Sequence, residues 1–405
     1  MSMRRLAAVL LCALSSPAAA QVDYGVSGYV DFRLVSPGDE VSWLQGGLGK
    51  ARYGNGDSNF QFAAAIGQGY VQLTSEILAV GVLRVEPEQR TAVDALEGYI
   101  RYRPVSTSSW RWSVKGGAFF APFSLENTEV GWSSYWTLTP SAINSWFGDE
   151  LRTVGAEGAV DWRTSAGTLE WIAAGFGWND PAGVMIADRG WAMDDRPTGL
   201  IDHLRLPDAT LVMFGDIPPG STPIFKEYDG RVGWYTGISW DDAAHWHLEV
   251  EYYDNEADPA AHHGGDFGWR TRFWNAGASW TVGDFTVLSQ ALTGDTVIDP
   301  FPGFSSKTDF DSAYLLVGWE RGEWRIAARG DWFRTHTDTT FGPSPALSEN
   351  GNALTGAVSW LPREWMRLTG EVLWIDSRRD GRAIEGIDPR QSDVQLQLSA
   401  RFYFD

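Results

Sequence analysis

The chain has 405 residues, of which 43% are hydrophobic and 21% charged, and its formal net charge is −20. This acidic balance argues against a nucleic-acid-binding protein, which needs a basic surface to displace counterions from phosphate. The 22 Trp, 13 Tyr and 20 Phe residues argue against a disordered chain, and the 45 Gly residues follow no strict period that would indicate collagen.

The first twenty residues are predicted to be a secretory signal peptide. Two arginines precede an apolar run over 6–14, and three alanines end the stretch before Gln21. Cleavage there would remove the single cysteine, Cys12, and leave 30 basic and 52 acidic residues, a net charge of −22. We therefore expect an exported domain over 21–405 without a disulfide or a cysteine-bound metal.

Alternation of apolar and polar residues with period two recurs to the end of the chain, and this period places the two sets on opposite faces of a strand. In the segment 323–335, the apolar face carries aromatic residues at Trp324 and Trp332. Aromatic residues at the edges of an apolar band, opposite a polar face, are typical of strands that cross a bilayer. The surplus of Trp and Tyr is therefore predicted to form girdles at the membrane interfaces. The longest apolar stretch, 77–83, is far shorter than the roughly 20 residues of a spanning helix.

The alternating segments predict about sixteen strands. Their expected spans are 22–34, 67–74, 77–85, 94–103, 110–120, 152–162, 167–178, 229–240, 245–255, 267–281, 285–295, 309–320, 323–335, 350–360, 366–376 and 392–404. Alternation is weak at Ala63–Ala65, so the sequence leaves fourteen and eighteen strands as alternative counts. An even count places both chain termini on the periplasmic side.

The links between these segments alternate in length. Short links fall at 163–166, 241–244, 282–284, 321–323 and 361–365, and long links at 121–151, 179–228, 256–266, 296–308, 336–349 and 377–391. This alternation predicts an all-β fold, a transmembrane antiparallel β-barrel with short periplasmic turns and long extracellular loops. About 24 residues per strand and connection leave no room for a separate plug domain, and 16 to 18 strands enclose a lumen wide enough for water.

Four segments carry a resemblance to a known family. They are 95–104 (ALEGYIRYRP), 115–127 (KGGAFFAPFSLEN), 139–144 (TPSAIN) and 148–155 (GDELRTVG). The chain resembles the phosphate-selective porin O and P family, specifically over about 95–178. The resemblance implies a homotrimeric, sixteen-stranded channel in the outer membrane of a Gram-negative bacterium, with loop 121–151 folded into the pore.

Anion selectivity is not expected to carry over from this family. Members that favour phosphate rely on basic residues in the pore, whereas this chain is acidic and its predicted mature part has four lysines: Lys50, Lys115, Lys226 and Lys307. General permeation by diffusion is the preferred interpretation.

Charged residues on the polar strand faces are the candidate pore lining, because rings of charge set ion preference. The predicted lining residues are Arg33, Arg101, Arg103, Arg111, Lys115, Glu157, Asp161, Arg231, Glu249, Glu251, Arg325, Arg329, Glu371 and Arg401. The same faces also carry Asp31, Glu97, Glu170, Glu320, Asp331 and Arg367. Two interpretations stay open for each residue: a salt bridge within the wall, or part of a field across the pore.

The two longest loops are both rich in acidic residues. Glu126, Glu129, Asp149 and Glu150 in loop 121–151 would make an acidic constriction if the loop folds inward, and would be solvated if it lies over the rim. Loop 179–228 carries seven aspartates and is expected to cap the mouth or bind a surface partner.

No complete hydrolase, dinucleotide, zinc-protease or EF-hand motif occurs, so we expect no catalytic residue, cofactor or metal. His247 shares a strand face with Glu249 and Glu251, and a lumen lining explains the three better than a metal site. The sequence therefore predicts an outer-membrane porin, surrounded by lipid, for passive diffusion of small hydrophilic solutes or ions. The alternatives are a channel that prefers phosphate or other anions, and a barrel enzyme or surface-binding protein with a closed lumen.

Overall fold

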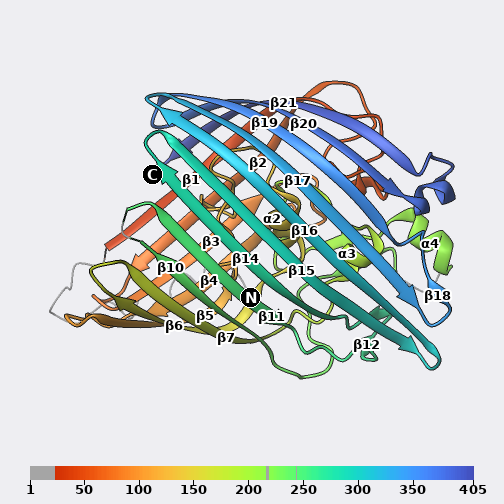
Figure 1. Cartoon of the computed structure of the whole chain (residues 1–405), viewed down its shortest axis with the longest axis horizontal. Helices are drawn as coiled ribbons and strands as arrows, with labels where there is room; N and C mark the ends of the chain where they lie inside the picture. Colours follow the sequence, from red (N-terminus) through yellow and green to blue (C-terminus); the bar gives the residue numbers. More distant parts are fainter. Residues whose placement is uncertain (1–22, 216–218, 243) are drawn as a thin grey trace, which may run out of the picture.

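The computed structural model describes residues 23–215, 219–242 and 244–405, so the predicted signal peptide lies outside the described residues. Sixteen antiparallel strands follow one another in chain order, and β1 pairs with β21 to close a barrel (Figure 1). The barrel strands are β1 (Asp23–Ser36), β2 (Asn59–Gln72), β3 (Ile77–Val85), β4 (Val93–Tyr102), β5 (Trp110–Phe119), β6 (Thr153–Arg163), β7 (Thr168–Gly177), β10 (Gly233–Asp241), β11 (Trp246–Asp254), β14 (Arg270–Val282), β15 (Phe285–Phe301), β16 (Phe304–Arg321), β17 (Trp324–Thr339), β19 (Glu349–Arg363), β20 (Met366–Arg379) and β21 (Arg390–Phe404). The predicted fold class and strand number are confirmed.

The remaining elements are short and lie in the loops. They are η1 (Trp43–Gln45), α2 (Ala142–Glu150), α3 (Val184–Asp188), β8 (His203–Arg205), α4 (Asp208–Phe214), β9 (Ser221–Pro223), β12 (His262–His263), β13 (Asp266–Phe267), β18 (Gly342–Pro343) and η2 (Asp380–Glu385). Within the described ranges, no helix is long and apolar enough to cross a membrane.

Most strands begin and end within four residues of the predicted positions, with exceptions at β2, β15 and β16. β15 ends at Phe301 and β16 begins at Phe304, so the predicted long link 296–308 is wrong and a tight hairpin joins these two strands. β2 begins at Asn59, eight residues before its predicted start. Its register against β1 shifts where Asp31 pairs with Ala64 and Phe32 with Phe62, which leaves Ala63 as the extra residue of a β-bulge. A bulge interrupts period two, and this explains why the alternation in this segment is weak.

The outer face of the barrel is apolar, with aromatic girdles. Near the short turns, tryptophans from neighbouring strands stack in three pairs with ring centroids 5.8, 5.3 and 6.2 Å apart: Trp110–Trp162, Trp246–Trp280 and Trp324–Trp360. Further along β10, β11 and β14, toward the long loops, Trp234, Tyr252 and Trp274 form a second row. Such rings sit at the headgroup level of a bilayer.

Three long connections contribute to the interior of the barrel: the first loop (37–58), the constriction loop (120–152) and the part of the long loop (178–232) that carries α3, whereas α4 of the long loop lies at the end of the barrel. Figure 1 shows α2 and α3 inside the barrel. All nine residues of α2 are buried, as are all five of α3. Within the described residues, the barrel is thus filled by its own strand connections.

The core of this filling is apolar and lies against the inner wall. Trp146 of α2 is fully buried, and its ring centroid is 5.4 Å from that of Phe273 on β14 and 5.1 Å from that of Phe310 on β16. Trp191 of the long loop packs on the same ring at 5.9 Å. The interior therefore has a hydrophobic core shared between wall and loops.

The predicted use of tryptophan is correct only in part. Five tryptophans are buried with at most 7% exposure, and all five belong to the loops or their edges: Trp43, Trp136, Trp146, Trp191 and Trp269. The aromatic surplus therefore serves an interior core as well as the membrane interfaces.

We predict that Trp146→Ala loosens the constriction loop without unfolding the barrel. Removal of a fully buried aromatic side chain costs about 3–5 kcal/mol because a cavity remains. Limited proteolysis should cut 120–152 faster, while the barrel keeps its heat-dependent shift in gel mobility. The matched control is Trp324→Ala on the outer face, where the residue is 48% exposed. Equal protection of the loop in both variants would contradict the prediction.

Candidate functional site

The constriction loop is fastened to the wall by Arg329 of β17. This guanidinium forms ion pairs with Glu126 of the loop and, at 2.8 Å, with Asp331 of its own strand, and all three side chains are fully buried. It also donates to the backbone oxygens of Thr139 and Pro140 at 2.8 and 2.9 Å. Every charge at this position is paired, so Arg329 and Glu126 act as a latch between wall and loop.

Wall carboxylates also hold the backbone of the loop. Glu371 of β20 accepts hydrogen bonds from the backbone N–H groups of Leu138 and Thr139 at 2.5 and 3.1 Å. Asp331 accepts one from Ala142 at 3.3 Å, at the first turn of α2. Because Glu371 is buried by these contacts, it positions the loop and does not face a permeating solute.

Two further carboxylates of the constriction loop join it to the long loop. Asp149 pairs with Arg189 at 3.1 Å, and Glu150 accepts hydrogen bonds from the backbone N–H groups of Met185 and Gly183 at 2.7 and 3.3 Å. Burial raises the pKa of Asp149 to about 6, although Arg189 opposes the rise. Burial also raises the pKa of Glu150. These groups therefore do not form an open acidic constriction.

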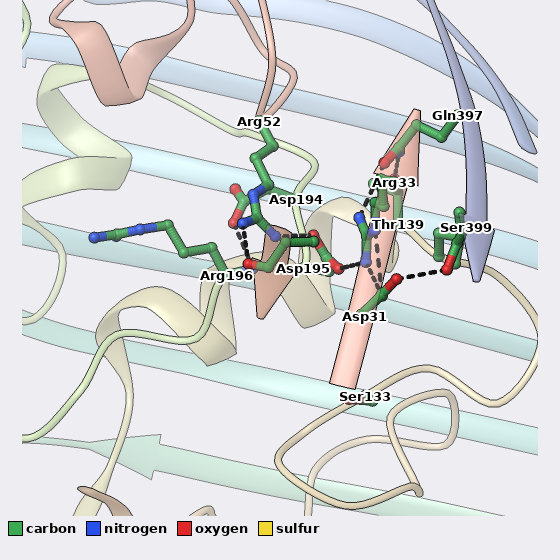
Figure 2. Close-up of polar contacts among 12 residues, drawn as sticks. Asp31, Arg33, Arg52, Ser133, Thr139, Asp194, Asp195, Arg196, Gln397 and Ser399 are labelled. Carbon is green, nitrogen blue, oxygen red and sulfur yellow. Dashed lines mark hydrogen bonds and ion pairs between the residues drawn. The ribbon is translucent and has the colours of Figure 1, made fainter. Parts of the chain in front are cut away.

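The long loop and the first loop meet the wall in a second buried network (Figure 2). Asp195 lies between Arg33 of β1 and Arg52 of the first loop, at 2.9 Å from the latter. Burial alone would raise the pKa of Asp195, but the two guanidiniums hold it well below its usual range. Arg33 also binds Asp31, which pairs with Arg401 of β21 at 2.9 Å. The predicted lining residues Arg33 and Arg401 thus belong to this second buried network.

Glu129 is the one carboxylate of the four predicted in the loop that keeps notable exposure, at 22% of its side chain. It accepts two hydrogen bonds of 2.9 Å from Arg367 of β20. Arg325 of β17 and Arg401 of β21 lie 3.8 and 3.9 Å from it. Three guanidiniums around one carboxylate make a basic patch in the periplasmic half of the lumen.

An acidic cavity lies on the other side of the barrel. It has a volume of about 400 Å³ and is bounded by Ser124 and Leu125 of the constriction loop. Its charged lining comes from three neighbouring strands: Glu170 (β7), Asp241 (β10), and His247, Glu249 and Glu251 (β11). These are the seventh to ninth strands around the sheet, and β20 and β21 are the fifteenth and sixteenth, so the acidic cavity and the basic patch face each other across the lumen.

Hydrogen bonds order the acidic cavity. His247 Nδ1 is 2.8 Å from Asp241 Oδ1, and its Nε2 is 3.1 Å from Glu249 Oε2. Glu251 accepts a hydrogen bond of 2.8 Å from Asn275 of β14. The buried Oε1 of Glu249 has no hydrogen-bond partner among the described residues. The cavity thus offers carboxylate oxygens to a cation.

Other predicted lining residues lie on the inner wall near the short turns. Lys115 of β5 pairs with Glu157 of β6 at 3.0 Å. Arg111 and Asp161 are register partners on the same two strands, and Arg101 of β4 is partly exposed opposite Lys115. This stretch of wall has charges of both signs.

The observed strand ends move two predicted residues off the wall, which corrects their assignment. β4 ends at Tyr102, so Arg103 lies in the turn that follows. β10 begins at Gly233, so Arg231 lies in an extracellular loop, where it pairs with Asp258 at 2.8 Å. Conversely, β10 continues to Asp241, a position predicted to be in a turn, so Asp241 is not among the predicted lining residues.

Asp180, Glu227 and Asp229 form the one acidic group of the described residues whose carboxylate oxygens lie within 4.8 Å of one another. Each accepts a backbone hydrogen bond, for example from Trp178 N–H to Glu227 at 3.0 Å. Burial raises the pKa of Asp180 to about 7, and its acidic neighbours add to the rise. Such a cluster does not by itself define a metal site.

Comparisons with known proteins relate the chain to solved barrels. No protein-family model matches the chain, and no curated protein matches it significantly in sequence. Among solved structures, the outer membrane channel DcaP of Acinetobacter baumannii is 11% identical, with a TM-score of 0.54 over 96% of this chain and 99% of that one. The anion-selective porin from Comamonas acidovorans is 11% identical, with a TM-score of 0.53 over 95% and 100%. OmpT of Vibrio cholerae, an outer membrane protein in its trimer form, is 8% identical, with a TM-score of 0.52 over 95% and 99%.

At these identities the similarity establishes the fold. The chain has the fold of a porin-type, sixteen-stranded antiparallel β-barrel.

We predict that Glu126→Gln releases the constriction loop. The substitution leaves Arg329 buried without one of its two ion-pair partners, and breaking a buried pair costs about 3–5 kcal/mol. Hydrogen exchange within 120–152 should accelerate, while exchange in the strands stays unchanged. Thr128→Ala is the control, because Thr128 is an exposed residue of the same loop whose side chain forms no hydrogen bond with the described residues. Slow exchange of the loop in Glu126→Gln would show that the latch is dispensable.

Proposed function

We propose that the protein is a porin for passive diffusion of small hydrophilic solutes or ions, with a weak preference for cations. The observation that carries this proposal is that acidic and basic lining residues lie on opposite sides of the lumen, in the periplasmic half of a porin-type barrel. The acidic cavity holds four carboxylates on β7, β10 and β11, and the basic patch is partly neutralised by Glu129. Opposed charges orient a polar solute as it passes, and the unpaired excess sets the ion preference.

Permeation requires no covalent chemistry, and the proposed role assigns no catalytic residue. Solutes would pass along the periplasmic half of the inner wall over β4 to β7, which carries partly exposed charges such as Arg101, Lys115 and Glu170. Membership of the phosphate-selective porin O and P family is still a prediction, which is based on the four segments that resemble this family.

An anion-preferring channel is the second candidate. Arg325, Arg367 and Arg401 surround the single, partly exposed carboxylate of Glu129, and guanidiniums bind phosphate well because their donors form a planar fork. This patch would act as the selective site if phosphate displaced Glu129 from it.

We predict that Glu170→Gln combined with Asp241→Asn lowers the preference for cations. A unit charge about 10 Å from a permeating ion in water contributes about 0.4 kcal/mol, so each lost charge should change the permeability ratio about twofold. The reversal potential in a potassium chloride gradient across a planar bilayer measures this ratio. The matched control is Asp284→Asn in the turn between β14 and β15, where the side chain is 47% exposed.

Three results would count against the cation proposal. An unchanged reversal potential in the double variant would exclude the acidic cavity from the conduction path. Anion preference in the unmodified protein, with block by micromolar phosphate that Arg367→Gln abolishes, would favour the second candidate. Folded protein without conductance would favour an enzyme or surface-binding barrel with a closed lumen.

We also propose that the barrel assembles as a homotrimer. The supporting observation is its similarity in fold to an outer membrane protein of Vibrio cholerae described in trimer form. Native mass spectrometry of the detergent-extracted protein should give three times the mass of one chain. A single chain mass under conditions that preserve the folded barrel would contradict the trimer.

A further inference from the structure

A second cavity lies at the opposite end of the barrel from the acidic cavity. It has a volume of about 310 Å³ and opens between the long loop and the extracellular ends of β15 and β16. Its lining is mainly apolar and includes Met213, Phe214, Trp269, Phe301 and Phe304. This volume is at the lower end of the range for small-molecule sites, which are typically apolar with few polar groups.

We call this second cavity the outer pocket, and its charged lining residues are all acidic. Among the described residues that line it, the charged ones are Asp188 at the end of α3 and Asp266 of β13, and none is basic. An apolar pocket with carboxylates alone repels anions. It also suits hydrated inorganic cations poorly, because those require several oxygen ligands.

Asp188 is the group that indicates a ligand. The residue is 7% exposed, and its carboxylate accepts no hydrogen bond and forms no ion pair with any described residue. Arg379 donates instead to the backbone oxygen of Asp188 at 2.6 Å. Burial raises the pKa of this carboxyl to about 7; Arg379 opposes the rise and Glu150 adds to it. An unpaired buried carboxylate is costly, and a bound cation would remove that cost.

The aromatic lining complements the carboxylate. Trp269 is 7% exposed, and the rings of Phe301 and Phe304 stack with centroids 5.1 Å apart at the rim. Aromatic rings attract ammonium groups and also cover an apolar body. We infer that the outer pocket binds a small organic cation, an ammonium group on an apolar or aromatic body, with the ammonium on Asp188.

This site is separate from the proposed permeation path. It uses loop residues and the extracellular ends of two strands, whereas the acidic cavity lies on β7, β10 and β11. Binding at the outer pocket can therefore be measured without any conductance, and its failure would leave the porin proposal untouched.

The test measures binding of 2-phenylethylammonium to the full-length folded barrel in lipid nanodiscs by isothermal titration calorimetry. Two matched compounds of similar shape are the neutral 2-phenylethanol and the anion 3-phenylpropanoate. We expect the cation to bind at least tenfold more tightly than the alcohol, and the anion not to bind. Asp188→Asn should abolish the difference between cation and alcohol, because it keeps the shape and removes the charge.

Two further variants serve as controls for the charge and for the apolar lining of the outer pocket. Asp309→Asn, at an exposed position paired with Lys307 on β16, should leave all affinities unchanged. Phe301→Ser, at a residue that is 48% exposed, should weaken the cation and the alcohol alike without disturbing the fold. Equal binding of cation and alcohol by the unmodified protein would overturn the proposal, as would a cation affinity that Asp188→Asn leaves unaltered.

Discussion

The interior of this barrel depends on the buried ion pair between Arg329 and Glu126. A guanidinium without access to water requires a partner, and the constriction loop supplies it together with two backbone oxygens. Once that loop is fixed, α2 brings Trp146 against Phe273, and Glu129 reaches the basic patch. The loop also closes one side of the acidic cavity. Charge pairing in the lumen therefore determines both where the hydrophobic core forms and which charges stay open to solutes.

Most of the barrel wall is predictable from the sequence, because period two is a local property of each strand. The faces of β11 follow directly from the alternation of Trp246 and Leu248 with His247 and Glu249. The prediction of β2 is wrong at its start, since the bulge at Ala63 places neighbouring alanines on the same face. The ends of β10 also shift, which moves Arg231 out of the wall and Asp241 into it.

The packing of the loops inside the barrel is much harder to predict, because its contacts join distant parts of the chain. Arg52 and Asp195 are 143 positions apart, and each looks like a solvated loop residue when it is considered alone. One local signal does exist. In β16 the run Leu315, Leu316, Val317 is apolar on both faces, and Leu316 is fully buried inside while Leu315 is 54% exposed outside. A strand without a polar face indicates burial on both sides.

The position of the filling along the chain has a consequence for assembly. The three inward loops lie between β1 and β10, whereas many of their wall partners, among them Arg329, Glu349 and Glu371, belong to β17, β19 and β20. The two sides of the inner core are therefore contributed by opposite halves of the polypeptide. They meet only after the sheet has curved round on itself. The packing of Trp146 on Phe310 of β16 and the hydrogen bond of 2.6 Å from the Trp191 backbone N–H to Glu349 of β19 therefore report on the arrival of the C-terminal strands. A chain that lost its C-terminal strands would leave these apolar loops uncovered, and interior packing thus distinguishes a complete barrel from an incomplete one.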